Sequence, residues 1–150
     1  MQPSNNCISL IKQFEGFKFK PYLCPANVAT IGYGTTVYPN NVKVQLTDNA
    51  ITEQQATEYL IDHVNKSTSK LNQFIKVELK QYQYDALCDF VYNVGLGAFS
   101  NSTLLKVINN NPNDLINIQA NFMKWVYANG KIIIGLQNRR KAEYNLYASK

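Results

Sequence analysis

Apolar residues near the N-terminus recur at helical spacing and then lose that period. The helical series is Ile8, Ile11 and Phe14. Ser4 or Asn5 can cap a helix there, and Gly16 can close it because glycine readily takes the left-handed conformation. Between residues 17 and 46 the apolar positions are separated by glycines and turn residues. That region is therefore expected to form a small antiparallel sheet.

Helical spacing returns after residue 50 and continues to the C-terminus. Thr52 and Gln55 fit a capping box, and the apolar residues that follow predict a helix of about 20 residues. Asn129-Gly130 is typical of a turn, and Arg139 and Glu143 have the spacing of a surface ion pair. Further helices are expected over the ranges 81–94, 102–108 and 115–125, and from about residue 136 onward.

These elements predict an α+β fold that is mainly α. A single domain over residues 1–150 is expected, because a chain of this length can bury a sizeable core. Within it, a small antiparallel β-sheet lobe at about residues 16–50 and a larger helical lobe at about 75–150 would be joined by the long helix that follows Thr52. A division into two lobes is typical of an enzyme with a cleft.

Charge and composition exclude some classes of partner. The 15 basic and 10 acidic residues give a formal net charge of +5, which favours a polyanionic partner but equally fits a solubilising surface. Because like charges do not cluster, no nucleic-acid module is expected. Residues 21–42 are uncharged, but their prolines and glycines are unsuited to a membrane helix. The first residues lack the features of a secretory signal, so neither membrane insertion nor export is expected.

The cysteines and the single histidine give no sign of a metal or a cofactor. Cys7, Cys24 and Cys88 are odd in number and lack metal-ligand spacing, so reduced thiols are expected, as in a cytosol. Cys88 lies among apolar residues and is expected to pack as a small hydrophobe. His63 has no second histidine or acid cluster to support a metal site or a triad, so a surface or core role is favoured.

Glu15 is the first candidate for chemistry because of its place at a helix end. A carboxylate there meets the negative pole of the helix dipole and unpaired backbone carbonyls, which disfavours its ionised form. A protonated acid near neutral pH is the expected result. Cys24 and Thr30 follow at intervals of eight and five intervening residues. From the residues alone, an ordinary solvated carboxylate is still the simpler interpretation of Glu15.

These residues resemble the active-site segment of the phage-type lysozymes, glycoside hydrolase family 24. That pattern is Glu, eight residues, Asp or Cys, five residues and Thr, and the form with Asp is the commoner one. The resemblance covers nearly the whole chain, and the order and spacing of its fragments make it specific. The further fragments are Ile31-Gly32-Tyr33-Gly34, Asp85-Ala86-Leu87, Tyr92-Asn93-Val94-Gly95, Ser102-Thr103-Leu104-Leu105, Trp125 and the run from Gly135 to Glu143.

The resemblance implies a lysozyme-like fold and a muramidase. It implies that Glu15 protonates the leaving oxygen, that Cys24 takes the second catalytic place and that Thr30 orients the attacking water. The bond hydrolysed, with inversion, would join N-acetylmuramic acid to N-acetylglucosamine in bacterial peptidoglycan. The implied substrate-binding residues are Gly34, Tyr92, Asn93 and Ser102. The protein would act as a monomer, an endolysin that stays in the host cytoplasm until a holin opens the membrane and then lyses the host cell.

Two other classes of function stay open at this point. Cys24 as nucleophile and His63 as base would make a thiol peptidase or amidase, in which replacing His63 abolishes activity. A wall-binding module without catalysis is also allowed, because the usual Asp is absent from position 24. A free thiol is mainly un-ionised at neutral pH unless its surroundings favour the thiolate. The environment of Cys24 therefore bears on all three hypotheses.

Overall fold

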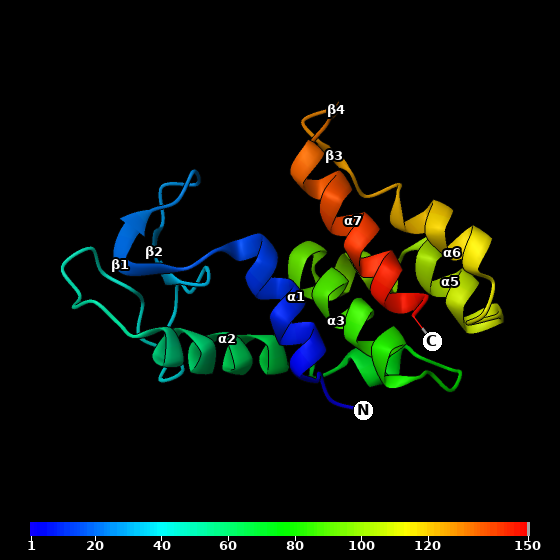
Figure 1. The fold of residues 1–150 in the computed structure, drawn as a ribbon, viewed down its shortest axis with the longest axis horizontal. Helices are drawn as coiled ribbons and strands as arrows, with labels where there is room; N and C mark the ends of the chain where they lie inside the picture. The colour runs from blue at the N-terminus through cyan, green and yellow to red at the C-terminus, as the bar shows by residue number, and fades with distance from the viewer. Residues whose placement is uncertain (150) are drawn as a thin grey trace. The chain divides into compact units, whose positions relative to one another are not determined.

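The computed structural model describes residues 1–149, which form mainly helices and two short antiparallel sheets (Figure 1). The predicted α+β, mainly α fold class is therefore confirmed. No helix in the described part of the chain is long and apolar enough to cross a membrane. The elements in chain order are α1 (Asn5–Glu15), β1 (Lys18–Leu23), β2 (Ala29–Gly32), α2 (Glu53–Thr68), the 3-10 helix η1 (Leu71–Gln73), α3 (Gln81–Val94), α4 (Leu96–Ser100), α5 (Thr103–Asn110), α6 (Leu115–Phe122), β3 (Tyr127–Ala128), β4 (Lys131–Ile132) and α7 (Ile134–Tyr147).

The chain folds into two compact units. One, here called the sheet unit, comprises Ile11–Lys66 and contains β1 and β2. The other, here called the helical unit, combines Met1–Leu10 with the chain from Ser67 onward. The boundary at residue 10 falls inside α1, so the first turns of that helix belong to the helical unit and its last residue, Glu15, to the sheet unit. Nothing in the sequence pattern indicated this division of α1.

The sheet in the sheet unit is shorter than predicted. β1 and β2 pair antiparallel, with Tyr22 opposite Thr30 and a shift in register before Tyr22. Pro21 lies at that shift, where it has no N–H to donate. Beyond β2 only isolated bridges occur, so much of the predicted sheet up to residue 46 is turns. The buried core of this unit includes Ile11, Ile31, Tyr33, Val44, Ala56, Leu60 and Val64.

The capping box that begins α2 is confirmed, but the helix ends earlier than predicted. The N–H of Gln55 donates to the Thr52 hydroxyl (3.1 Å), and the N–H of Thr52 donates to the Gln55 side-chain oxygen (2.9 Å). The helix stops at Thr68 and only a 3-10 turn follows. Residues 67–69 are Ser-Thr-Ser, whose hydroxyl groups compete for backbone hydrogen bonds and weaken a helix.

Phe90 on α3 is the centre of the core of the helical unit. Its ring packs edge-on against those of Phe99, Phe122 and Trp125, with centroids 5.9, 5.5 and 5.5 Å away. Trp125 is thus packed as expected, although α6 ends before it, at Phe122. The predicted helix over 81–94 is confirmed as α3, whereas the short helix α4 was not predicted. The Asn129-Gly130 turn is confirmed, and both residues have positive φ, as a two-residue hairpin loop requires.

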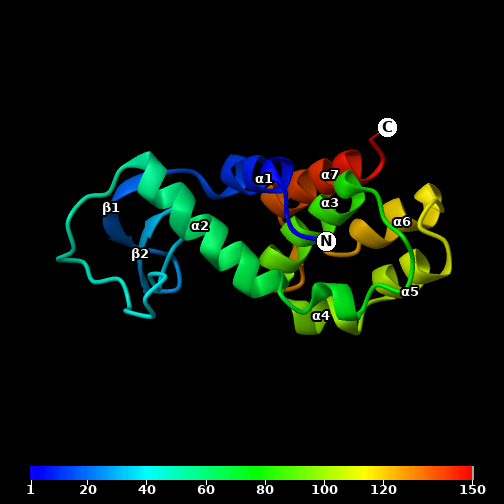
Figure 2. The ribbon, with the colours of Figure 1, turned by 90° about the horizontal axis from the view of Figure 1, so that it is seen from below.

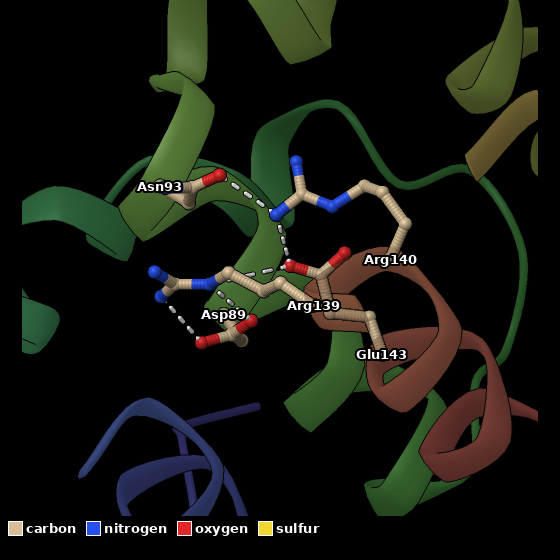
Figure 3. A network of polar contacts seen from close by, with 5 residues as sticks. All are labelled: Asp89, Asn93, Arg139, Arg140 and Glu143. Carbon is tan, nitrogen blue, oxygen red and sulfur yellow. Dashed lines mark hydrogen bonds and ion pairs between the residues drawn. The ribbon is translucent and has the colours of Figure 1, made fainter. Parts of the chain in front are cut away.

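A buried network of charges joins α3 to α7, which lie side by side in Figures 1 and 2. Arg139 donates to both carboxylate oxygens of Asp89, at 3.1 and 2.8 Å. One nitrogen of Arg140 donates to Asn93 (2.7 Å) and to Glu143 (2.5 Å), as Figure 3 shows. The predicted ion pair between Arg139 and Glu143 is therefore present, but its expected place on the surface is wrong. Both residues are buried, and the closest approach between their charged atoms is 3.8 Å.

Replacing the central ring should unfold the helical unit far more readily than removing an exposed apolar side chain. We expect Phe90→Ala to lower the free energy of unfolding by about 3–5 kcal/mol, because it leaves a cavity among three aromatic rings. Ile116→Ala, at a position 82% exposed on α6, should change it by no more than about 0.5 kcal/mol. Urea denaturation of both variants tests this, and equal losses would contradict the assignment of Phe90 to the core.

Candidate active site

Glu15 is the last residue of α1, as the sequence predicts. Gly16 closes the helix with a φ of +68°, and its N–H donates to the carbonyl of Lys12 at 3.2 Å. A side chain at Gly16 would meet no neighbouring atom within 4 Å, so the backbone conformation, not lack of space, favours glycine there. The Glu15 side chain is half-buried in the sheet unit. The helix end thus holds a carboxylate just before β1 begins.

Cys24 begins the tight turn that joins β1 to β2. Its N–H donates to the carbonyl of Val28 (3.0 Å), and the N–H of Asn27 donates to the carbonyl of Cys24 (2.8 Å). Asn27 has a φ of +60°, a conformation that asparagine tolerates better than most residues. Pro25 suits the second position of such a turn because its φ is already fixed near the required value. The turn therefore has a defined shape, and the Cys24 side chain lies half-buried at its start.

This turn stabilises the ionised form of the Cys24 thiol. Hydrogen bonding from the backbone N–H of Val28 is the largest effect that lowers the pKa of Cys24 below its ordinary value. The N–H of Ala26 and the hydroxyl of Thr30 lower this pKa further and outweigh the opposing effect of partial burial. By contrast, a hydrogen bond with Cys88 and burial raise the pKa of Cys7 far above the ordinary value. Of Cys7 and Cys24, only Cys24 thus has surroundings that favour a thiolate.

Thr30 lies on β2 next to the turn, and its side chain is buried. Its hydroxyl donates to the carbonyl of Val28 at 2.9 Å, and the same hydroxyl lowers the pKa of Cys24. A hydroxyl has one proton, so it donates to the carbonyl or to the sulfur at any one time. The structure therefore brings Cys24 and Thr30 together, as the sequence pattern predicts.

Tyr22 is a neighbour of the site that the sequence pattern did not single out. It lies opposite Thr30 across the sheet, and Cys24 follows two residues later on the chain. Burial, then the charges of Cys24 and Glu15, raise the pKa of the Tyr22 hydroxyl. Tyr22 is thus close enough for both candidate catalytic groups to act electrostatically on its hydroxyl. The alternation of side chains along a strand was the available signal, because residues two apart share a face.

Gly34 lies in a second tight turn, with a φ of +85°. Ile31 and Thr35 close this turn by exchanging two backbone hydrogen bonds of 2.9 Å each. Gly32, with a φ of +65°, leaves room for α2, since a side chain there would come within 3.0 Å of Ala56. Both glycines thus serve the backbone geometry, and substrate binding at Gly34 stays a prediction.

The other three predicted substrate-binding residues belong to the helical unit. Tyr92 is half-buried near the end of α3, and Asn93 accepts the hydrogen bond from Arg140. Ser102 caps α5 as predicted: it accepts from the N–H of Leu105 (3.1 Å) and donates to the carbonyl of Phe99 (2.7 Å). The Ser102 hydroxyl is buried and already makes both of these bonds. A role in substrate binding stays a prediction for all three residues.

The remaining titratable residues do not assemble a metal centre within residues 1–149. No group of three or more histidine, cysteine, aspartate or glutamate side chains there is arranged to hold an ion. His63 is exposed on α2 and is not among the groups that shift the pKa of Cys24. The candidate site itself offers a carboxyl group at Glu15, a thiol at Cys24 and a hydroxyl group at Thr30.

The comparisons with known proteins place this fold among the lysozyme-like hydrolases of the glycosidase type. The model of the phage lysozyme family matches residues 12–143, and the chain accordingly belongs to that family. Lysis of bacterial peptidoglycan is the activity of this family of endolysins and lysozymes, although some members differ in activity. The matched range includes all of the predicted site residues.

Several similar proteins are endolysins. The chain is 42% identical to an endolysin of Acyrthosiphon pisum secondary endosymbiont phage 1, over 99% of each chain. It is 40% identical to an endolysin of Bacillus phage PZA over 99% of its own length, but spans only 56% of that relative. Among solved structures, an endolysin from Escherichia coli O157:H7 phage FAHEc1 superposes with a TM-score of 0.89 at 33% identity, covering 99% of this chain and 94% of that one.

The different surroundings of the cysteines predict selective alkylation. With substoichiometric iodoacetamide on the folded protein near neutral pH, we expect modification at Cys24 well ahead of Cys7 and Cys88. The reason is that Cys24 is partly accessible and has a lowered pKa, whereas the other two thiols are buried. Peptide mass spectrometry over a time course measures this order. Labelling of all three at the same rate, with the fold intact, would contradict it.

Proposed function

We propose that this chain is an endolysin-type muramidase that hydrolyses the β-1,4 bond between N-acetylmuramic acid and N-acetylglucosamine. The observation that carries the proposal is the turn at Cys24, which favours a negative charge at the position that corresponds to Asp or Cys in the pattern that the sequence resembles. The helix end at Glu15 supplies a carboxyl group in the same compact unit. The biological role that follows is lysis of the host cell, after release from the cytoplasm through a holin-opened membrane.

In the proposed reaction Glu15 gives its proton to the leaving glycosidic oxygen. Breaking that bond leaves positive charge on the sugar, and a negative group on the opposite face is needed to stabilise it and to activate water. The Cys24 thiolate fits that second role. It takes the proton from a water molecule whose oxygen attacks the anomeric carbon, so the product has inverted configuration. In the net reaction one water molecule is consumed and one glycosidic bond is broken.

Thr30 is proposed to hold this water together with Cys24. When its hydroxyl donates to the carbonyl of Val28, its oxygen still has a lone pair with which to accept from water. A water that donates one hydrogen to the sulfur and one to the Thr30 oxygen keeps a lone pair for the attack. The proposed monomeric protein then needs no metal or cofactor for this step.

The two rival classes are weaker on this structure. A thiol peptidase needs a base beside its nucleophile, and the groups that lower the pKa of Cys24 are backbone N–H groups and a hydroxyl. A wall-binding module without catalysis has no need for a stabilised thiolate in a defined turn. Assays of His63→Ala and Glu15→Gln separate the classes, because the peptidase requires His63 and the binding module requires neither residue.

Glu15→Gln should abolish hydrolysis and leave the fold intact. Loss of the general acid should slow the reaction by about 100-fold or more, whereas the side chain keeps its size. Release of reducing sugar ends from purified peptidoglycan, with mass analysis of the products, measures the rate and identifies the bond. Glu58→Gln, the same substitution at an exposed position of α2, is the matched control and should stay active. More than a tenth of the wild-type rate in Glu15→Gln would refute the proposal.

Replacing Cys24 tests the role of its negative charge. Cys24→Asp should keep or raise activity, because a carboxylate is ionised throughout the working range, whereas Cys24→Ala should lose most of it. The wild-type rate should rise with pH as the thiol ionises. The midpoint of that rise should lie below the pH of about 8.5 at which a free cysteine is half ionised, because the turn lowers the pKa of Cys24. The Asp variant should show no such rise.

Alkylation provides the control for this experiment. Iodoacetamide should inactivate the wild type but not Cys24→Asp, which lacks the reactive thiol and keeps Cys7 and Cys88. Melting temperatures of the three proteins show whether a lost rate comes from a lost fold. If Cys24→Ala matched the wild type at every pH, the sulfur would have no part in the reaction.

A further inference from the structure

A groove of about 530 Å³ lies within the sheet unit, and none of the candidate catalytic residues lines it. It is formed by the long connection between β2 and α2, which runs from cyan to green-blue in Figure 2, together with the first turns of α2. Its volume is in the usual range for small-ligand sites. The residues that matter for its chemistry are Tyr38, Asp48, Asn49, Ile51, Gln55 and Tyr59.

The walls of this groove are held in place by the fold. The Tyr38 hydroxyl donates to one oxygen of Asp48 at 2.8 Å, and the N–H of Gln45 donates to the same oxygen at 2.8 Å. The rings of Tyr38 and Tyr59 pack edge-on, with centroids 5.4 Å apart. The side-chain oxygen of Gln55 is fixed by the capping box of α2. A ligand would therefore meet preformed groups and would not have to order them.

The groove lining offers a ligand the kinds of group that bind sugars. Aromatic rings and the side chain of Ile51 offer flat apolar surface, on which the face of a pyranose ring packs. The second oxygen of Asp48, the Tyr59 hydroxyl, the Asn49 amide and the Gln55 amide nitrogen make no hydrogen bond to other described residues. They supply directional donors and acceptors for hydroxyl and acetamido groups.

The charge of the lining narrows the class of ligand. The described lining holds one carboxylate and no lysine or arginine, so a phosphate or carboxylate group would be repelled. A purely apolar ligand would leave the amides and the hydroxyl without partners, which is unfavourable. A neutral, hydroxyl-rich ligand with apolar ring faces satisfies both limits.

We propose that this groove is a second glycan-binding site that takes a neutral N-acetylated hexosamine segment and performs no chemistry. It would keep the enzyme on a polymeric wall between successive cleavages by raising the local concentration of glycan. The identity of the glycan rests on the proposed function, since peptidoglycan is the polymer that the catalytic site would cleave. The existence of the groove and its sugar-binding character do not depend on catalysis.

Titration of the inactive variant tests binding directly. In ¹⁵N-labelled Glu15→Gln, a trimer of N-acetylglucosamine should shift the amide signals of the groove residues along a saturable curve. Adding Tyr59→Leu should weaken binding at the groove by about five-fold or more, because an aliphatic chain replaces the stacking ring. Tyr144→Leu, the same change at a half-buried position of α7, should leave the binding curve unchanged. Absence of shifts at the groove, or equal affinity in Tyr59→Leu, would overturn the proposal.

Asn49→Ala guards against a folding defect in Tyr59→Leu. Asn49 is exposed and holds no other residue in place. Removing its side chain should therefore weaken the binding of the trimer by a measurable factor without altering the melting temperature of the protein. If Tyr59→Leu fails to fold, an unchanged affinity in Asn49→Ala overturns the proposal by itself.

Activity measurements separate this proposal from the proposed function. In the otherwise wild-type enzyme, Tyr59→Leu should lower the rate on insoluble walls several-fold more than the rate on short soluble glycan fragments. An equal effect on both substrates would argue against a site that retains the enzyme on polymer. If the wild type cleaves neither substrate, the muramidase proposal fails, and the trimer titration still decides the groove.

Discussion

The buried charges between α3 and α7 are the constraint on which the helical unit depends. Charged groups lose water when they are buried, so each must find a partner or change its charge state. Asp89 and Arg139 solve this by a paired contact through two hydrogen bonds. Any shift of α7 along α3 would break that contact and leave a buried carboxylate unpaired. The pairing therefore fixes the register of the two helices, and with it the hydrogen bond from Arg140 on α7 to Asn93 on α3.

Arg140 and Glu143 are less fully satisfied. Two nitrogens of Arg140 and one oxygen of Glu143 make no hydrogen bond within the described structure, and each such buried group costs about 1–3 kcal/mol. Part of the cost is offset because the Arg140 guanidinium lies 4.8 Å from the centre of the Phe90 ring. Burial, then the nearby carboxylate of Asp89, raise the pKa of Glu143 well above its ordinary value. A raised carboxyl pKa favours the fold at low pH, and that contribution is lost as pH rises from the unfolded pKa through the folded one.

The sequence predicted the fold class and the local geometry of the site more fully than it predicted burial. Gly16, the Thr52 capping box, the Ser102 cap and the Asn129-Gly130 turn were predictable because each depends on backbone conformation within a few residues. The burial of Arg139 and Glu143 was not, since it depends on Asp89, which lies 50 residues before Arg139. The early end of α2 and the shortness of the sheet were not predicted. Both depend on competition between local hydrogen bonds of similar strength, and the spacing of apolar residues does not show which of these bonds form.

The turn at Cys24 gives a physical reason why one position can hold either Asp or Cys. An aspartate at the start of a turn accepts hydrogen bonds from backbone N–H groups two or more residues later, and Ala26 and Val28 offer such groups to the sulfur here. The backbone therefore supplies a site for a negative charge, whichever side chain carries it. A thiol needs that help, since alone it is mainly un-ionised at neutral pH, whereas a carboxylate does not.

The same geometry couples the charge on Cys24 to the orientation of Thr30. The carbonyl of Val28 accepts from the N–H of Cys24 (3.0 Å) and from the Thr30 hydroxyl (2.9 Å), so it loses only one of two partners if the hydroxyl turns away. A hydrogen bond to an ionised sulfur is stronger than one to a neutral carbonyl. The carbonyl of Val28 and an ionised Cys24 sulfur therefore compete for the single proton of the Thr30 hydroxyl. The Thr30 hydroxyl thus lies between two acceptors, and whichever of them takes its proton, its oxygen keeps a lone pair that can accept from water.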